Sequence, residues 1–192
     1  TEFKNRYLSN PKHPNVFIAK AVVFEGPEDY HKRLNNKKLK IDENSILIIR
    51  GCGPVGYPGS AEVINMQPPD RLLKKGINTL PTLGDGRQSG TSASPSILHV
   101  SPESAIGGDL GIVKTGDKIK IDLNKRRVDL LISQSEFKNR RKKRKKFKIN
   151  NQTPWQEIFR DTVGQLEDGA CIKSRGIYLK VSTSKGIPRD SH

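Results

Sequence analysis

The chain contains two short apolar runs rich in β-branched residues, and these constrain its fold more than any other feature. Val16–Phe24 lies between Pro14 and Gly26, and Ser45–Ile49 leads directly into the loop 51–59, which is dense in glycine and proline. Runs of this length and composition, bounded by such residues, are typical of buried strands. We therefore expect a sheet whose strands end in tight loops, where the backbone can approach a ligand closely.

Further elements follow along the chain. A third strand is expected over 78–83, and the alternating segments 118–123 and 128–132 predict a hairpin. An amphipathic helix is expected from Thr153-Pro154, and its apolar stripe predicts that it docks on the domain. The stripe consists of Trp155, Ile158, Phe159, Val163 and Leu166. These elements together predict a compact α/β domain built on a closed or nearly closed mixed β-barrel, with short flanking helices and a docked C-terminal helix.

Positive charge is concentrated in one segment. The net charge is +15, and the nine cations of 138–148 account for the excess, because the rest of the chain carries only +6. Phe147 is the one aromatic residue in this run, which is poor support for a base-stacking platform. We interpret the run as a solvated helix end or linker, with a polyanion site as the alternative. The expected organisation is an N-terminal cut segment or linker (1–15), a barrel-type domain (16–137), a basic helix end or linker (138–152), and a C-terminal helix and tail (153–192).

Composition limits the class of protein. An apolar fraction of 33% and a charged fraction of 29% indicate one modest core with much solvated surface. No apolar run approaches the roughly 18 residues that cross a bilayer, which excludes an integral membrane protein. The first residues, 1–6, contain neither an initiating Met nor a signal region, and we expect a cut within a longer chain. Cys52 and Cys171 form no paired metal motif or disulfide scaffold, so a reducing, cytoplasmic setting is expected.

Two loops could carry chemistry. The first places Glu62 after Gly56-Tyr57-Pro58-Gly59, in the first turn of an expected short helix over 61–65. Its carboxylate would be stabilised by the helix dipole or would be a hard oxygen ligand for a divalent cation. The second loop, 85–92, gathers Arg87, Ser89 and Thr91 among glycines. It is either a turn with a helix cap or a site for an anion or polyol, with a hydroxyl acting as acid or base.

Several motifs stand in a fixed order along the chain. They are AVVFEG (21–26), IRGCGP (49–54), GYPG (56–59) with Glu62, GDGRQSGT (84–91), HVSPE (99–103), GG (107–108) and GD (116–117). Together they resemble the C-terminal region of the dihydroxy-acid and sugar-acid dehydratase family, from about Val16 to His192. The end of the chain, 188–192, resembles the pentonate-dehydratase branch. RQSGT over 87–91 is similar to the sugar-acid enzymes, because the branched-chain biosynthetic enzymes usually carry Phe-Ser-Gly-Gly-Thr there.

The resemblance implies a swivelling β/β/α barrel and a hydro-lyase reaction. A 2,3-dihydroxy sugar acid would lose water through an enol and give a 2-keto-3-deoxy acid. Ser89 matches the serine that takes the proton from C2, Thr91 matches a substrate hydrogen-bonding position, and Arg87 is assigned to substrate binding beside them. Glu62 matches a Mg²⁺ ligand. A serine hydroxyl becomes a strong base only where adjacent cations lower its pKa, so we expect Ser89 beside metal.

The resemblance also implies cofactors and partners outside this chain. The full-length parent would hold Mg²⁺ and an iron–sulfur cluster, [2Fe-2S] or another type, whose ligands lie in an N-terminal domain and not in this chain. The fragment alone is then expected to be inactive. Expected partners are a small sugar acid, the parent's N-terminal domain and further copies in a dimer or tetramer, with neither nucleic acid nor a membrane.

Two alternative functions stay open. One is dihydroxy-acid dehydration in branched-chain amino acid biosynthesis, and the more remote one is a polyanion-binding module that uses 138–148. The dehydratase interpretation also predicts how the two loops are arranged. Both loops should open at one end of the barrel, with the side chains of Glu62 and Ser89 within roughly 10 Å, the span of a small substrate with its metal shell.

Overall fold

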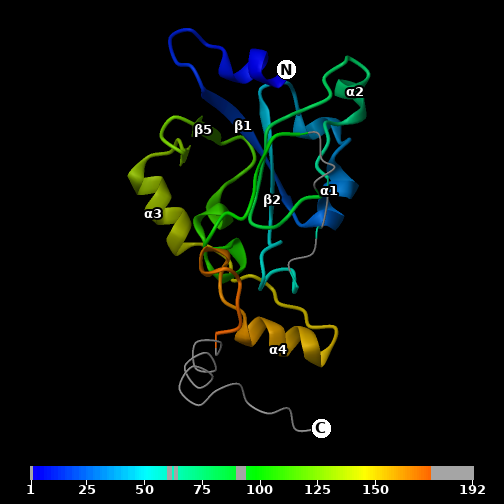
Figure 1. The fold of residues 1–192 in the computed structure, drawn as a ribbon, viewed down its shortest axis with the longest axis vertical. Helices are drawn as coiled ribbons and strands as arrows, with labels where there is room; N and C mark the ends of the chain where they lie inside the picture. Colours follow the sequence, from blue (N-terminus) through cyan, green and yellow to red (C-terminus); the bar gives the residue numbers. More distant parts are fainter. Residues whose placement is uncertain (1, 60–61, 63–64, 90–93, 174–192) are drawn as a thin grey trace, which may run out of the picture.

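The computed structural model describes residues 2–59, 62, 65–89 and 94–173. They form a six-stranded mixed sheet curled as half a barrel, in the order β4-β3-β2-β1-β5-β6, with short helices around it (Figure 1). The strands are β1 (Val16–Glu25), β2 (Ser45–Arg50), β3 (Thr82–Gly84), β4 (Ser96–Ile97), β5 (Lys118–Asp122) and β6 (Arg127–Leu130). The α-helices are α1 (Pro27–Arg33), α2 (Asp70–Leu73), α3 (Gln134–Lys142) and α4 (Pro154–Thr162). The expected mixed α/β class is confirmed.

Strand direction changes at the centre of the sheet. β1 pairs in parallel with β2 on one side and antiparallel with β5 on the other. β3 and β4 continue the parallel half, and β6 returns from β5 as the expected hairpin, with Asp122 opposite Arg127. Because β1, β2 and β3 run in the same direction, the loops that follow them leave the sheet at the same edge. In open α/β sheets this edge is where ligands bind.

The two faces of the sheet carry separate apolar clusters, because side chains alternate along each strand. Phe24 and Leu47 belong to the first cluster, which also includes Tyr30 of α1 and Leu72 of α2. Figure 1 shows these two helices together on one side of β2, while α3 lies on the opposite side. The second cluster includes residues from β1, β2, β3 and β5. Its buried members are Ala19, Ala21, Val23, Ile46, Ile48, Leu83, Leu110, Val113, Ile119 and Ile121.

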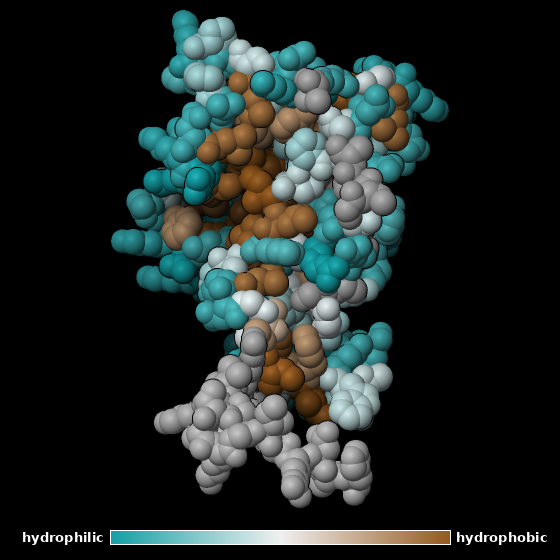
Figure 2. All heavy atoms as spheres, viewed as in Figure 1, coloured by the Kyte–Doolittle hydropathy of each residue, from teal (hydrophilic) through white to brown (hydrophobic). Residues whose placement is uncertain are grey.

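The inner face of the half-barrel is partly open. A cleft of about 680 Å³ is lined by apolar side chains of Leu83, Leu110, Ile119, Leu130 and Phe137. Figure 2 shows apolar side chains gathered in a hollow in the middle of this face. The described sheet ends at the edge strands β4 and β6, which are not paired with each other.

The last helix begins where the sequence predicts but packs differently. The hydroxyl of Thr153 accepts the amide of Gln156 at 3.3 Å, which caps α4. The prediction that the stripe docks through Trp155 is wrong, since that side chain is 78% exposed and Ile158 is 52% exposed. Arg160 attaches the helix by donating to the carbonyl of Val55 at 2.8 Å. Helical spacing shows which side chains share a face, but not whether a neighbour covers that face.

The basic run begins inside α3, a helix that Ser133 caps by accepting the amide of Glu136 at 3.2 Å. Arg140 is only 11% exposed and pairs with Asp117, so the interpretation of the whole run as solvated is wrong at this residue. Arg141 pairs with Asp109 at 2.9 Å. Within the described ranges, no helix combines the length and apolarity needed to cross a bilayer.

Candidate active site

The two glycine-rich loops lie side by side. Glu62, beyond loop one (51–59), forms a parallel β-bridge with Arg87 of loop two (85–92). The guanidinium Nη2 of Arg87 lies 2.8 Å from the carboxylate Oε1 of Glu62. Ser89 follows two residues after Arg87. The expectation that both loops open at one end of the sheet is confirmed, since β2 and β3 are parallel neighbours.

The surroundings of Glu62 differ from the expectation. The prediction that it lies in the first turn of a helix is wrong, because its backbone is in the extended bridge with Arg87. The carboxylate therefore interacts with a guanidinium and not with a helix dipole. Both side chains of the pair are about 45% exposed, so they are accessible to a ligand. Thr91 lies outside the described residues, and the separation of Glu62 from Ser89 stays a prediction.

A buried carboxylate at the start of loop two holds the start of loop one. Asp85 is fully buried and accepts the amides of Gly51 at 3.1 Å and Cys52 at 2.9 Å. It also accepts the amide of Ser104 at 2.9 Å and the hydroxyl of Ser104 at 2.5 Å. Four donors around one carboxylate compensate its removal from water. Asp85 thus ties three segments together, four residues before Ser89.

A second buried carboxylate holds the rest of loop one. Glu103 is fully buried and accepts the amides of Val55 and Gly56, both at 2.8 Å. Gln165 binds the same residue twice, because its Nε2 donates to the Glu103 carboxylate at 2.8 Å and its Oε1 accepts the Glu103 amide at 2.9 Å. Loop one is therefore fixed along its length by two acids, neither of which belongs to it.

Two glycines permit these close approaches. A Cβ on Gly86 would lie 2.5 Å from the carbonyl oxygen of Cys52, so any larger residue would push loop two away from loop one. A Cβ on Gly53 would lie 2.5 Å from Oε2 of Glu103 and would displace the carboxylate. Gly86 thus allows loop two to lie against loop one, and Gly53 allows the Glu103 carboxylate to lie against loop one.

Sequence reasoning missed Asp85 and Glu103. The signal for Asp85 was present in Gly84-Asp85-Gly86, an acid between two glycines directly after an apolar strand. That pattern indicates backbone approaching the carboxylate from several sides. Glu103 had a weaker signal, because its main-chain donors come from Val55 and Gly56, far away in the sequence.

The described residues do not complete a site for either implied cofactor. The carboxylate of Glu62 is a hard oxygen ligand of the kind that Mg²⁺ prefers, but one carboxylate is not enough to hold the ion. The described part of the chain contains no cluster of three or more His, Cys, Asp or Glu able to hold a metal. Cys52 is fully buried. Burial, and then the charges of Asp85, Glu28 and Glu103, raise the pKa of its thiol. A thiol kept protonated in this way does not fit an iron–sulfur cluster, which needs thiolate ligands.

Comparison with known proteins places this arrangement in a family. Residues 8–170 match the family described as dihydroxy-acid/6-phosphogluconate dehydratase C-terminal. The chain belongs to this dehydratase family. D-xylonate dehydratase of Caulobacter vibrioides is 53% identical over 191 residues, which cover all of this chain and 32% of that protein. L-arabinonate dehydratase of Rhizobium leguminosarum is 39% identical, over 94% of this chain and 30% of its own length.

The chain is also similar to family members whose names indicate another class of substrate. A dihydroxy-acid dehydratase of Thermodesulfovibrio yellowstonii is 38% identical over 82% of this chain and 28% of its own length. This dehydratase C-terminal domain therefore spans about a third of the length of the curated relatives it matches. The region that matches the family model contains both loops and both buried carboxylates.

Proposed function

We propose that this domain is the C-terminal part of a hydro-lyase that dehydrates a sugar acid to a 2-keto-3-deoxy acid. The observation that carries the proposal is the bridge between Glu62 and Arg87, because it joins the loops of two parallel strands at the sheet edge. A carboxylate and a guanidinium then border one accessible region, and we expect the hydroxyl of Ser89, two residues after Arg87, to reach the same region. The similarity to dehydratases of D-xylonate and L-arabinonate supports a pentonate as the substrate.

Each residue has a role in this proposal. Arg87 would bind the substrate carboxylate, since a guanidinium matches that group in a bidentate pair. Thr91 would hydrogen-bond the substrate, and Ser89 Oγ would take the proton from C2. The C3–O bond then breaks, the departing hydroxyl takes up the proton removed from C2 and leaves as water, and the enol tautomerises to the 2-keto acid by losing its O–H proton and gaining one at C3. Mg²⁺ ligated partly by Glu62 would supply positive charge that makes the Ser89 hydroxyl more acidic when the ion is bound.

The proposal includes the parts that this chain does not contain. The remaining Mg²⁺ ligands and an iron–sulfur cluster would come from the parent's N-terminal domain, so the isolated domain would be inactive. The parent would be a cytoplasmic homo-oligomer. Arg87 must exchange Glu62 for the substrate in this scheme, which the exposure of both side chains permits.

A direct assay tests the proposal. The full-length protein, with its cluster intact, is incubated with D-xylonate, L-arabinonate, a hexonate and 2,3-dihydroxyisovalerate, and the 2-keto acid formed is measured. We expect the highest kcat/KM for a pentonate. Absence of turnover with all four substrates by the cluster-loaded protein would contradict the proposal.

Branched-chain dihydroxy-acid dehydration is the second candidate. The similarity to the dihydroxy-acid dehydratase of Thermodesulfovibrio yellowstonii favours it, at 38% identity. Preferential turnover of 2,3-dihydroxyisovalerate in the same assay would establish this alternative. A polyanion-binding module using 138–148 is less well supported, since Arg140 and Arg141 are already paired with carboxylates.

A further inference from the structure

A second cleft, of about 590 Å³, borders loop one at the ends of β1 and β2. Among the described residues that line it, eight are Lys or Arg, and Glu25 is the one acidic residue. The cleft adjoins loop one through Ser104, whose hydroxyl accepts the amide of Gly51 at 2.9 Å. Of the described residues assigned to the dehydration site, which are Glu62, Arg87 and Ser89, none lines it.

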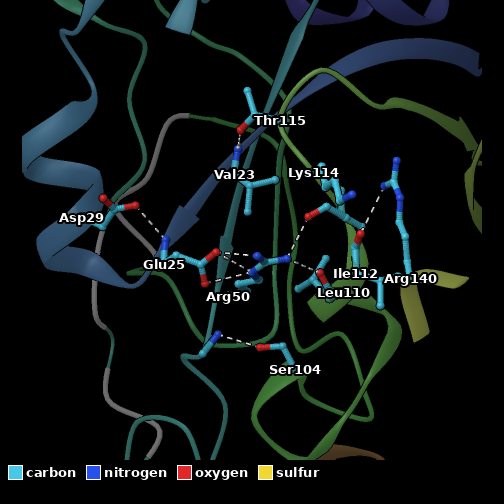
Figure 3. A network of polar contacts seen from close by, with 12 residues as sticks. Val23, Glu25, Asp29, Arg50, Ser104, Leu110, Ile112, Lys114, Thr115 and Arg140 are labelled. Atoms are coloured by element: carbon cyan, nitrogen blue, oxygen red, sulfur yellow. Dashed lines mark hydrogen bonds and ion pairs between the residues drawn. The ribbon is translucent and has the colours of Figure 1, made fainter. Parts of the chain in front are cut away.

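Two arginines build fixed walls of this basic cleft. Arg50 donates to the carbonyls of Leu110 at 3.0 Å and Val113 at 2.8 Å, and it pairs with Glu25. Figure 3 shows the Arg50 guanidinium between Glu25 and the Leu110 carbonyl, with Arg140 further along the same wall. Arg140 is held by Asp117 and Glu136. The charges of Arg50 and Arg140 are largely neutralised by these carboxylates. The two side chains therefore contribute mainly a rigid surface to the cleft.

The lysines supply the uncompensated charge. Lys143, Lys145, Lys146 and Lys148 line the cleft, and none of them forms an ion pair with any residue that the structure describes. Their segment is attached at two points. Arg144 donates to the carbonyl of Gly107, and the ring of Phe147 packs so closely on Gly51 that a Cβ there would lie 2.7 Å from it. The lysine backbone is thereby held beside the cleft.

We propose that this basic cleft binds a small multivalent anion, a compound with several phosphate or carboxylate groups. Cations confined around one cleft repel each other, and a multivalent anion between them would remove that repulsion. The volume lies within the range typical of small-molecule sites, about 300–1,000 Å³. A nucleic acid is a poorer occupant, because Phe147 is the one aromatic residue among the described residues that line the cleft, which leaves little for bases to stack on.

Calorimetry on the full-length protein tests this proposal without measuring activity. Pyrophosphate and citrate are titrated separately in magnesium-free buffer, with ionic strength held constant by NaCl. The test variant combines Lys143→Gln, Lys145→Gln and Lys146→Gln. The matched control combines Lys37→Gln, Lys38→Gln and Lys74→Gln, three exposed lysines that do not line the cleft and whose loss changes the net charge equally.

We expect the wild type and the control variant to bind at least one of the two anions with equal affinity, and the test variant to bind it at least tenfold more weakly. Binding of pyrophosphate alone would identify a phosphate ligand, and binding of citrate alone would identify a polycarboxylate. Equal weakening in both variants would overturn the proposal, because only net charge would then matter. Failure of both anions to bind, or tighter binding of a single-stranded oligonucleotide than of either, would also overturn it.

Discussion

The carboxylate of Asp85 accepts the backbone amide of Cys52 at 2.9 Å, so a side chain of loop two holds the main chain of loop one. The same carboxylate holds Ser104, which lines the basic cleft. The position of loop one therefore depends on an acid that is itself only four residues from Ser89. We expect a change at Asp85 to alter the geometry of the whole site.

Replacing Asp85→Asn should loosen loop one. The amide NH₂ of Asn would face backbone donors that now meet a carboxylate oxygen, and unsatisfied buried groups cost about 1–3 kcal/mol each. We expect faster alkylation of Cys52, measured by mass spectrometry in a Cys171→Ser background, and a lower urea midpoint. Asp109→Asn is the control, since that acid is 50% exposed and its ion pair with Arg141 lies at the surface. An unchanged labelling rate in the Asp85 variant would show that this acid does not hold loop one.

Alkaline pH should destabilise the chain through Cys52. Burial raises the pKa of its thiol, so the folded state keeps the proton to a higher pH than the unfolded state does. The stabilisation is complete below the unfolded pKa of about 8.5 and decreases as pH rises above it, by about 1.4 kcal/mol per pH unit. Urea unfolding at several pH values should show a steeper loss for the wild type than for Cys52→Ala. Tyr7 and Tyr30, whose pKa values are also raised, are present in both proteins and cancel in the comparison.

Two adjacent arginines of α3 should differ sharply in importance. Arg140→Gln leaves Asp117, which is only 10% exposed, without its ion-pair partner, and we expect a loss of about 3 kcal/mol in unfolding free energy. Arg141→Gln breaks a pair that is 56% and 50% exposed, which should cost less than about 1 kcal/mol. Urea denaturation of both variants provides the measurement. Equal losses would mean that burial does not distinguish these two pairs.

Ser89→Ala should abolish turnover in the full-length protein and leave the visible absorption of its cluster intact. Removing a general base typically lowers the rate by about 10²–10⁴-fold, and more where no other group can take the proton. Ser135→Ala, at an exposed serine of α3, should retain the wild-type rate. An active Ser89 variant would assign proton removal to another residue.

Local patterns predicted the elements well. The apolar runs of β1 and β2, the hairpin of β5 and β6, and the start of α4 at Thr153 follow from residue alternation and side-chain chemistry within a few positions. β3 is shorter than expected and begins only at Thr82. The order of the strands in the sheet could not be predicted, because the sequence of one strand does not specify which other strands pair with it.

The site was predictable only in part. Its two loops could be found by their glycines and its candidate residues by resemblance, but the contact between Glu62 and Arg87 depends on β2 and β3 being parallel neighbours. The role of Glu103 could not be predicted, since its donors lie almost fifty residues away. The exposure of Trp155 was missed for the opposite reason, because an apolar face need not be covered within the same chain.

The central place of β1 sets an order of assembly on the ribosome. Its parallel edge can pair once β2 has been synthesised, but its antiparallel edge waits for β5, about a hundred residues after Val16. Until then, one side of the central strand offers unpaired amides and carbonyls to any extended chain nearby. Contacts so distant in sequence also slow folding. We infer that the nascent domain stays vulnerable to misassociation until the β5–β6 hairpin emerges, and that protection during this interval must come from outside the domain.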